Sequence, residues 1–334
     1  MRFVVYGAGG VGGTIGGRLA LAGHDVVLIC RGAHLAAIRE RGLFLRTPAF
    51  ERTIPVEAVA HPRDVRWTGD EHVLLTMKTQ DTESALRDLE LAAGTAMPVF
   101  CVQNGVENER LALRRFERVY ATLVALPATF VTPGEVIASA APLSGCLHSG
   151  SYPGSVDATV TAVCAAFAGA GFHALPSEDV MALKYRKLVL NLGNGIEIIT
   201  GESGWAAQGA QGEFVDAARR EALAVYASAG IRSTSPAEYV ERVTAFYKAA
   251  PVGGVARSGS STLQSVQRGH QTTEVDYLNG EIEMLGRLYG VPTPYNTVIR
   301  RVATRMAAGG EQPGSTSIEA LNQMVAALPT DRPA

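Results

Sequence analysis

The stretch RFVVYGAGGVG (residues 2–12) constrains the fold more than any other part of the chain. Arg2 to Tyr6 has the apolar, β-branched composition of a buried strand, and the next glycines fit G-x-G-x-x-G at the start of a helix predicted for 11–22. There, the first glycine permits a tight turn, the second lets a pyrophosphate approach the backbone, and the third lets helix and strand pack closely. The predicted dinucleotide-binding residues are Gly7, Ala8, Gly9, Gly10, Val11 and Gly12. The alternative is a glycine-rich turn with a purely structural role.

The rest of the first half alternates apolar runs with helical periodicities. Strands are predicted at 25–30, 72–77 and 98–102, and helices at 34–41, 82–91, 107–115 and 157–168, with further strands, several of them antiparallel, within 117–175. Such alternation is typical of a parallel sheet covered on both faces. From residue 178 helical periodicities dominate, at 179–199, 212–229, 236–248, 273–289, 295–307 and 318–328. We therefore predict an α/β protein: an N-terminal Rossmann-type doubly wound sheet (1–177), then an all-helical domain for substrate and catalysis (178–330).

Composition narrows the class of protein and its compartment. The 30 basic and 32 acidic residues give a net charge of -2, which argues against a nucleic-acid partner. Four widely spaced cysteines in apolar surroundings suggest free thiols in a reducing compartment, and seven scattered histidines predict no metal site. No apolar run approaches the roughly 18 residues of a membrane span, and the chain opens directly on a strand with no room for a signal peptide. A cytoplasmic protein with no membrane partner is expected.

The residues after the later strands bear on the choice of cofactor. The second strand ends in Ile29, Cys30 and Arg31, without the acid that usually binds the ribose hydroxyls of NAD. An arginine there suits a 2′-phosphate, so NADP(H) is favoured, although Arg31 could also be a solvated loop residue. Lys78 and Asn104 follow two further strands, where they could reach the cofactor or serve as structural turn residues.

A polar helix face is predicted in KYRKLVLNLGNG (184–195). Lys184, Lys187, Asn191 and Asn194 fall within an arc of roughly 80° on a continuous helix. The ordinary interpretation is a solvated face. Asparagine is a poor helix former, however, which suggests that these side chains bind something. Further along, Thr273 is expected to cap a helix whose first turn holds Glu274, where the carboxylate could simply complement the helix dipole.

Taken together, the chain resembles the ketopantoate reductase (2-dehydropantoate 2-reductase) family over nearly its whole length. The motifs that carry the resemblance, in order, are GAGGVG (7–12), MKT (77–79), QNG (103–105), YRKLVLN (185–191), SSTLQ (260–264) and TEVDYLNG (273–280). The family reduces the ketone of a 2-keto acid with NADPH, at a cleft between a Rossmann domain and a helical domain. The resemblance therefore implies reduction of 2-dehydropantoate to pantoate, a step of pantothenate biosynthesis, with a small 2-keto acid as substrate.

The resemblance also implies roles for single residues. Lys187 matches the family's general acid, Asn191 a substrate-binding asparagine, and Asn104 the asparagine that touches both cofactor and substrate. Ser261 matches the serine that holds the substrate carboxylate, Glu274 a glutamate at the cofactor and substrate end of the cleft, and Lys78 a cofactor-side lysine.

The chain departs from the family pattern on the substrate side. The second asparagine, Asn194, stands three residues after Asn191 rather than four, and SSTLQS replaces the usual SSMLQD. The loop from there to Glu274 is also one residue longer than in the family, so Ser260 or Thr262 could take the place of Ser261. The side chain of Asn194 would reach a different point from that of the family's second asparagine.

Two other functions compete with this interpretation. An NADP-dependent β-hydroxy acid dehydrogenase also uses a Lys-x-x-x-Asn, but usually has a glycine-rich turn just ahead of the lysine, where this chain has DVMALKYR. A non-catalytic NADP(H)-sensing regulator would be expected to lack Lys187, Asn191 and Glu274, which are all present. The apolar stripe of the helical half would support a homodimer, although a buried core explains it equally well.

Overall fold

The protein is described here from a computed structural model covering residues 1–130, 132–204, 207–254, 259, 263 and 273–329. It divides into two compact units. Unit 1 comprises Met1–Lys184 and Thr234–Arg257, and unit 2 comprises Tyr185–Ser233 and Ser258–Ala334. Within the described ranges, no helix is both long and apolar enough to cross a membrane.

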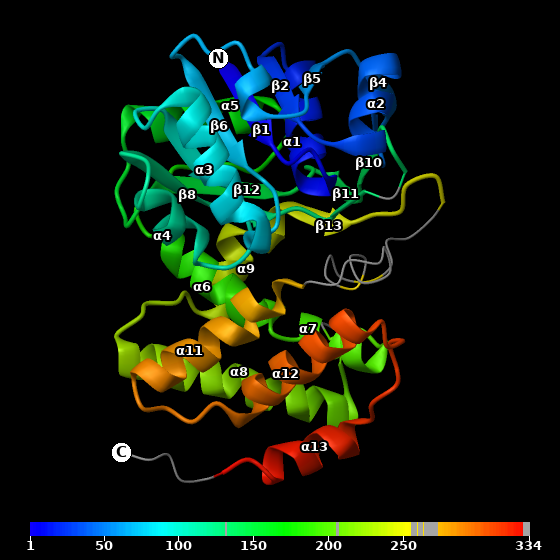
Figure 1. Ribbon diagram of the computed structural model, residues 1–334, viewed down its shortest axis with the longest axis vertical. Helices are drawn as coiled ribbons and strands as arrows, with labels where there is room; N and C mark the ends of the chain where they lie inside the picture. The colour runs from blue at the N-terminus through cyan, green and yellow to red at the C-terminus, as the bar shows by residue number, and fades with distance from the viewer. Residues whose placement is uncertain (131, 205–206, 255–258, 260–262, 264–272, 330–334) are drawn as a thin grey trace. The chain divides into compact units, whose positions relative to one another are not determined.

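Unit 1 is built on a seven-stranded sheet with the order β12-β8-β7-β6-β1-β2-β5 (Figure 1). All neighbouring pairs are parallel except β8 with β12. The strands are β1 (Arg2–Tyr6), β2 (Asp25–Ile29), β5 (Glu57–Val59), β6 (Glu71–Leu75), β7 (Pro98–Cys101), β8 (Arg118–Ala125) and β12 (Cys146–Ser151). The predicted parallel Rossmann-type sheet is confirmed, and β1 has the predicted bounds because its apolar run is fully buried on both faces.

Side-chain alternation along the strands builds two cores. Phe3 and Val5 of β1 face one core together with α1 (Gly10–Leu21), α2 (Gly32–Arg41) and α5 (Ala158–Gly169). Val4 and Tyr6 face the other core, under α3 (Thr82–Ala93) and α4 (Asn108–Leu113). Because the side-chain period of a strand is two, one short run supplies both cores.

Two smaller sheets complete unit 1. One has the order β4-β3-β10-β9, from β3 (Leu43–Arg46), β4 (Glu51–Ile54), β9 (Ala128–Thr129) and β10 (Glu135–Ala138). It packs on α1 so closely that a Cβ at Gly17 would lie 3.1 Å from both Leu43 and Ile54. The other sheet pairs β11 (Ala140–Pro142) with β13 (Tyr247–Ala249). The strands β9, β10 and β11 lie within 117–175, where further strands were predicted, whereas β3, β4 and β13 were not predicted.

The pairing of β13 explains why the chain departs from the helix predicted at 236–248 and from the predicted domain division at 177/178. The helix expected at 236–248 ends as α9 (Pro236–Arg242), with a short 3-10 turn, η3 (Thr244–Phe246), leading into β13. Arg242 forms an ion pair with Asp179 at 2.7 Å, and the backbone of β13 pairs with β11. Residues 234–257 therefore belong to unit 1, a return of the chain that the predicted division at 177/178 did not include.

Unit 2 is helical, as predicted. Its core lies among α7 (Asn194–Thr200), α8 (Gly209–Ala229), α12 (Pro294–Gly309) and α13 (Ile318–Ala326), with η4 (Glu274–Tyr277) and α11 (Asn279–Leu288) packed alongside. The expected helix 179–199 is two helices, α6 (Val180–Asn191) and α7, separated at Leu192 and Gly193. The break allows close backbone packing: a Cβ at Gly193 would lie 2.7 Å from the carbonyl oxygen of Gly204.

Candidate active site

The carboxyl ends of β1, β2, β6 and β7 lie along one edge of the main sheet. The chain runs from β1 through α1 to β2 on one side, whereas β6 joins β1 on the other side. Ligands of doubly wound sheets bind at the carboxyl edge of such a switch point. The segments that leave these four strands contain the glycine loop, Arg31, Lys78 and Asn104. Unit 1 thus brings together all the residues predicted to contact the cofactor except Glu274.

The glycine loop has the geometry that its three motif glycines suggest. Gly7 has a φ of +105°, and a Cβ there would lie 2.7 Å from the amide nitrogen of Met77. A Cβ at Gly12 would come within 2.3 Å of the Gly7 carbonyl oxygen and the Thr76 hydroxyl. A Cβ at Gly9, in contrast, would meet nothing within 4 Å. Gly7 and Gly12 are therefore required by packing, while Gly9 leaves open space where a ligand could approach.

The N-terminus of α1 suits an anion. Its N-cap residue, Gly9, has no side chain that could accept hydrogen bonds from the first backbone N–H groups, and the first turn contains no acidic residue. The first backbone N–H groups of a helix have no acceptor within the helix, and the dipole adds positive potential at this end. A pyrophosphate is the group that such a turn binds.

Arg31 lies just beyond β2, as the exposed N-cap of α2 in extended conformation. It is near Tyr6, at the end of β1. Burial and the charge of Asp88 raise the pKa of the Tyr6 hydroxyl, and the positive charge of Arg31 opposes that rise. The guanidinium therefore sits at the sheet edge beside the glycine loop, on the β2 side where the adenosine ribose of a dinucleotide is held.

The segments after β6 and β7 are joined by hydrogen bonds. The amide of Gln103 donates to the Met77 carbonyl at 3.0 Å and to the Thr82 hydroxyl at 2.7 Å. Thr82 donates to Asn108, whose amide donates to Thr79 and, at 3.2 Å, to the Asn104 carbonyl. This network fixes Lys78, the N-cap of η2 (Thr79–Asp81), and Asn104 relative to each other.

Two acceptors in this network lack a partner. The side-chain oxygens of Gln103 and Asn104 are buried and accept no hydrogen bond from the described residues. A buried polar atom without a partner costs free energy on the order of 1–3 kcal/mol. Such an atom beside a glycine loop fits a cofactor that donates a hydrogen bond, as the carboxamide of a nicotinamide does.

Lys184 is bound inside unit 1. Its ammonium forms an ion pair with Glu109 at 2.5 Å and donates to the Gln103 carbonyl at 3.0 Å. The Lys184 and Glu109 side chains are 2% and 0% exposed. Lys184 therefore holds the turn that contains Asn104. The sequence analysis missed Glu109, although its position in the first turn of the helix after QNG was a usable signal.

Unit 2 carries the other predicted residues. Lys187 is half-buried and Asn191 is 3% exposed, one turn apart on α6. Asn194 is also buried, but it begins α7, so the continuous-helix arc that placed it beside Lys187 is wrong. Glu274 is buried in η4, while Ser261, with Ser260 and Thr262, lies outside the described residues.

Asn279 is a further residue that the sequence analysis overlooked. Its amide donates to the Leu192 carbonyl at 3.2 Å, at the break between α6 and α7, and to Asn296 at 3.0 Å. Asn296 in turn donates to half-buried Glu221, and partial burial raises the pKa of that carboxyl against the opposing hydrogen bonds. Asn279 thereby fixes the end of the helix that bears Lys187 and Asn191. The expected cap at Thr273 is absent, since its buried hydroxyl has no partner.

Two family models match this arrangement of motifs. Residues 3–152 match "Ketopantoate reductase PanE/ApbA", and residues 179–307 match "Ketopantoate reductase PanE/ApbA C terminal". Together the two matches span most of the chain. The chain belongs to the ketopantoate reductase family. The family consists of oxidoreductases that use NADPH, and this protein is an enzyme of that class.

Relatives within and around the ketopantoate reductase family agree with this assignment. The 2-dehydropantoate 2-reductases of Mesorhizobium japonicum and Archaeoglobus fulgidus are 28% and 26% identical, each over 92% of this chain and 98% of their own. A PanE/ApbA family ketopantoate reductase from Ralstonia eutropha superposes with a TM-score of 0.79 at 28% identity, over 93% of this chain and all of its own. A D-mandelate dehydrogenase, solved with NADH and anilino(oxo)acetate, shares the fold with a TM-score of 0.77 at 23% identity, over 93% and 99%.

Proposed function

We propose that this protein reduces a 2-keto acid to a 2-hydroxy acid with NADPH, and that its substrate is 2-dehydropantoate, which it converts to pantoate. The observation that carries the proposal is the pair Lys187 and Asn191, one turn apart on α6, in a chain that also contains the glycine loop and Asn104. The names of the relatives support the substrate.

The geometry of unit 1 supports the proposed cofactor residues. The open space at Gly9 and the N-terminus of α1 would hold the pyrophosphate, and Arg31 the 2′-phosphate of NADP(H). Asn104 would accept a hydrogen bond from the nicotinamide carboxamide, and Lys78 would contact phosphate or ribose oxygens. Bound NADPH supplies the hydride. Glu274, buried in η4, completes the proposed set from unit 2.

Lys187 has the chemistry that the carbonyl requires. As the ketone carbon is reduced, negative charge develops on its oxygen. A positioned ammonium stabilises that charge and then donates a proton, which leaves the alcohol and a neutral amine. Asn191 and Asn194 can hydrogen-bond the hydroxyl or carboxylate of the substrate without neutralising Lys187. Ser261 is proposed to bind the carboxylate, with Ser260 and Thr262 as the alternatives.

The test is the initial rate of NADPH oxidation with ketopantoate, comparing the wild type with Lys187→Ala. Loss of a general acid should lower kcat by roughly 100-fold or more. Lys248→Ala is the matched control, because Lys248 is an exposed lysine on β13 and is not one of the proposed site residues. A wild-type rate in Lys187→Ala would refute the assignment of the acid.

The same assay separates the competing functions. Turnover of an aryl 2-keto acid such as benzoylformate, without turnover of ketopantoate, would keep the reaction and change the substrate. Oxidation of a β-hydroxy acid with NADP would support the β-hydroxy acid dehydrogenase. NADPH binding without turnover of any of these acids would support the regulator.

A further inference from the structure

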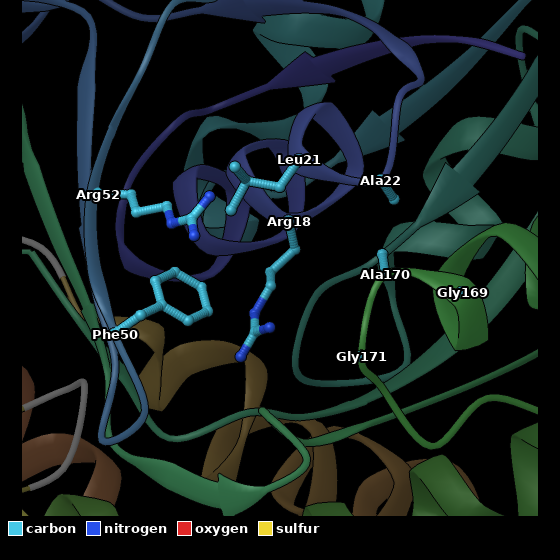
Figure 2. A pocket seen from close by; sticks show the side chains of 8 residues that line it. All are labelled: Arg18, Leu21, Ala22, Phe50, Arg52, Gly169, Ala170 and Gly171. Atoms are coloured by element: carbon cyan, nitrogen blue, oxygen red, sulfur yellow. The ribbon is translucent and has the colours of Figure 1, made fainter.

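A pocket lies in unit 1, at the other end of α1 from the glycine loop. It has a volume of about 320 Å³ and is formed by the last turn of α1, the turn that enters β4 and the loop after α5 (Figure 2). Arg18 of this pocket follows Gly10 by eight residues, which corresponds to about 12 Å along a helix. The pocket is therefore distinct from the predicted pyrophosphate site.

Two arginines converge on one aromatic ring in this pocket. The Arg18 guanidinium carbon lies 4.8 Å from the centre of the Phe50 ring, and that of Arg52 lies 6.0 Å from it. Figure 2 shows the two side chains approaching Phe50 from α1 and from β4. Phe50 itself is held by a turn, since its carbonyl accepts hydrogen bonds from the Thr47 amide and hydroxyl at 2.8 and 2.9 Å. The aromatic platform is thus fixed before any ligand arrives.

Neither arginine has an anionic partner. Among the residues that the structure describes, the guanidinium groups of Arg18 and Arg52 form no hydrogen bond and no ion pair, and the buried Nε of Arg18 is unsatisfied. Burial lowers the pKa of the Arg18 guanidinium, with no carboxylate to oppose the effect. A partly desolvated guanidinium without an acceptor is unfavourable, whereas a bound oxyanion would accept from both arginines.

The other residues of the pocket indicate what the rest of the ligand would be. Leu21, Ala22 and Ala170 add apolar surface beside the Phe50 ring, and Gly171 leaves room next to Arg18, where a Cβ would lie 3.1 Å from the guanidinium. We propose that this pocket binds a small molecule with one oxyanion group, a phosphate monoester or a carboxylate, attached to an apolar body. The oxyanion would bridge Arg18 and Arg52, and the apolar body would lie against Phe50.

A structural role for Arg18 is the competing explanation. It stands in the last turn of α1, where a cation complements the helix dipole. This role predicts hydrogen bonds to the terminal carbonyl oxygens, and the Arg18 guanidinium makes none to the described residues. It also leaves the second arginine, Arg52, unexplained.

Calorimetric titration of the full chain tests the proposal, with phenyl phosphate and benzoate as probes and benzamide as the uncharged control. We expect one of the two anions to bind, with the dissociation constant raised at least tenfold by Arg18→Met and by Arg52→Met. The control variant Arg31→Met removes the cation at the proposed dinucleotide site, so it should not change this binding, whether or not the proposed function is correct. No binding, equal binding of benzamide, or a loss in Arg31→Met as large as in Arg18→Met would overturn the proposal.

Thermal unfolding without ligand gives a second readout. Arg18→Met should change the midpoint by no more than a few degrees, because it removes an unpaired, partly buried charge but also its contact with the Phe50 ring. A larger fall would overturn the proposal, because it would show that the protein itself satisfies Arg18.

Discussion

The buried pair between Lys184 and Glu109 gives a prediction whose size follows from the structure. Lys184→Met keeps the length of the side chain but leaves the Glu109 carboxylate with no ion-pair partner at 0% exposure. Breaking a buried ion pair by removing one partner costs about 3–5 kcal/mol, because the remaining charge stays desolvated. The variant should therefore lose a large fraction of a typical stability of about 5–15 kcal/mol.

The double variant Lys184→Met/Glu109→Gln separates the pair from simple packing damage. Because it removes both charges, it should recover part of the loss, so that the two single changes are not additive. The coupling energy should exceed about 1.5 kcal/mol, within the range of residues in direct contact. Asp216 and Arg219 offer a matched exposed pair on α8, with side chains 59% and 26% exposed, whose coupling should stay below about 1 kcal/mol.

Urea unfolding of the wild type, the two single variants and the double variant, followed by circular dichroism, measures this coupling. Amide hydrogen exchange of β7 and β8 localises it, since Lys184 also reaches the carbonyls of Gln103 and Thr122 at 3.0 and 3.4 Å. Single variants that each cost less than about 1 kcal/mol, or costs that simply add, would refute the reasoning.

Two further predictions concern the choice of cofactor and the loss of stability at acidic pH. Arg31→Ala should raise KM for NADPH by roughly tenfold or more while leaving KM for NADH nearly unchanged, because only NADPH carries the 2′-phosphate. Steady-state kinetics with both cofactors would check this, and equal effects on both KM values would contradict it. The Leu175 amide donates to Nδ1 of His148 at 3.0 Å, so Nε2 carries the proton donated to the Arg242 carbonyl at 2.8 Å. Burial lowers the pKa of this neutral imidazole to about 4. The unfolded state takes up a proton below about 6.5, so stability should fall by about 3 kcal/mol as pH drops from 6.5 towards 4. His148→Gln should flatten that slope in unfolding measured across this range, and an unchanged slope would contradict the assignment.

The fold was predictable where one segment determines its own structure. The β1 strand and the glycine loop follow from eleven consecutive residues, because continuous apolar character and a fixed glycine spacing have few structural solutions. The strands β3, β4 and β13 and the pairing of the two small sheets were not predictable, because strands of two to four residues carry almost no periodicity of their own. β13 forms because it pairs with β11, which lies more than a hundred residues earlier in the chain.

The candidate site shows the same limit. Lys184 and Lys187 share a helix face in sequence, yet Lys184 is bound to Glu109, 75 positions earlier, and belongs to unit 1. The break before Asn194 depends on the backbone of Gly204, which no local pattern reveals. Residue types and spacing therefore identified the candidate residues, whereas the environment of each one depends on distant contacts.

The most direct test of the proposed chemistry is a single-turnover measurement of NADPH oxidation with ketopantoate, made on wild type, Lys187→Ala and Lys248→Ala. The dissociation constant of NADPH is measured on the same samples. We predict that Lys187→Ala slows hydride transfer by roughly 100-fold or more, with NADPH bound as tightly as in the wild type and Lys248→Ala unaffected. Hydride transfer in Lys187→Ala within a few-fold of the wild type, with cofactor and substrate both bound, would contradict the proposal that Lys187 is the acid.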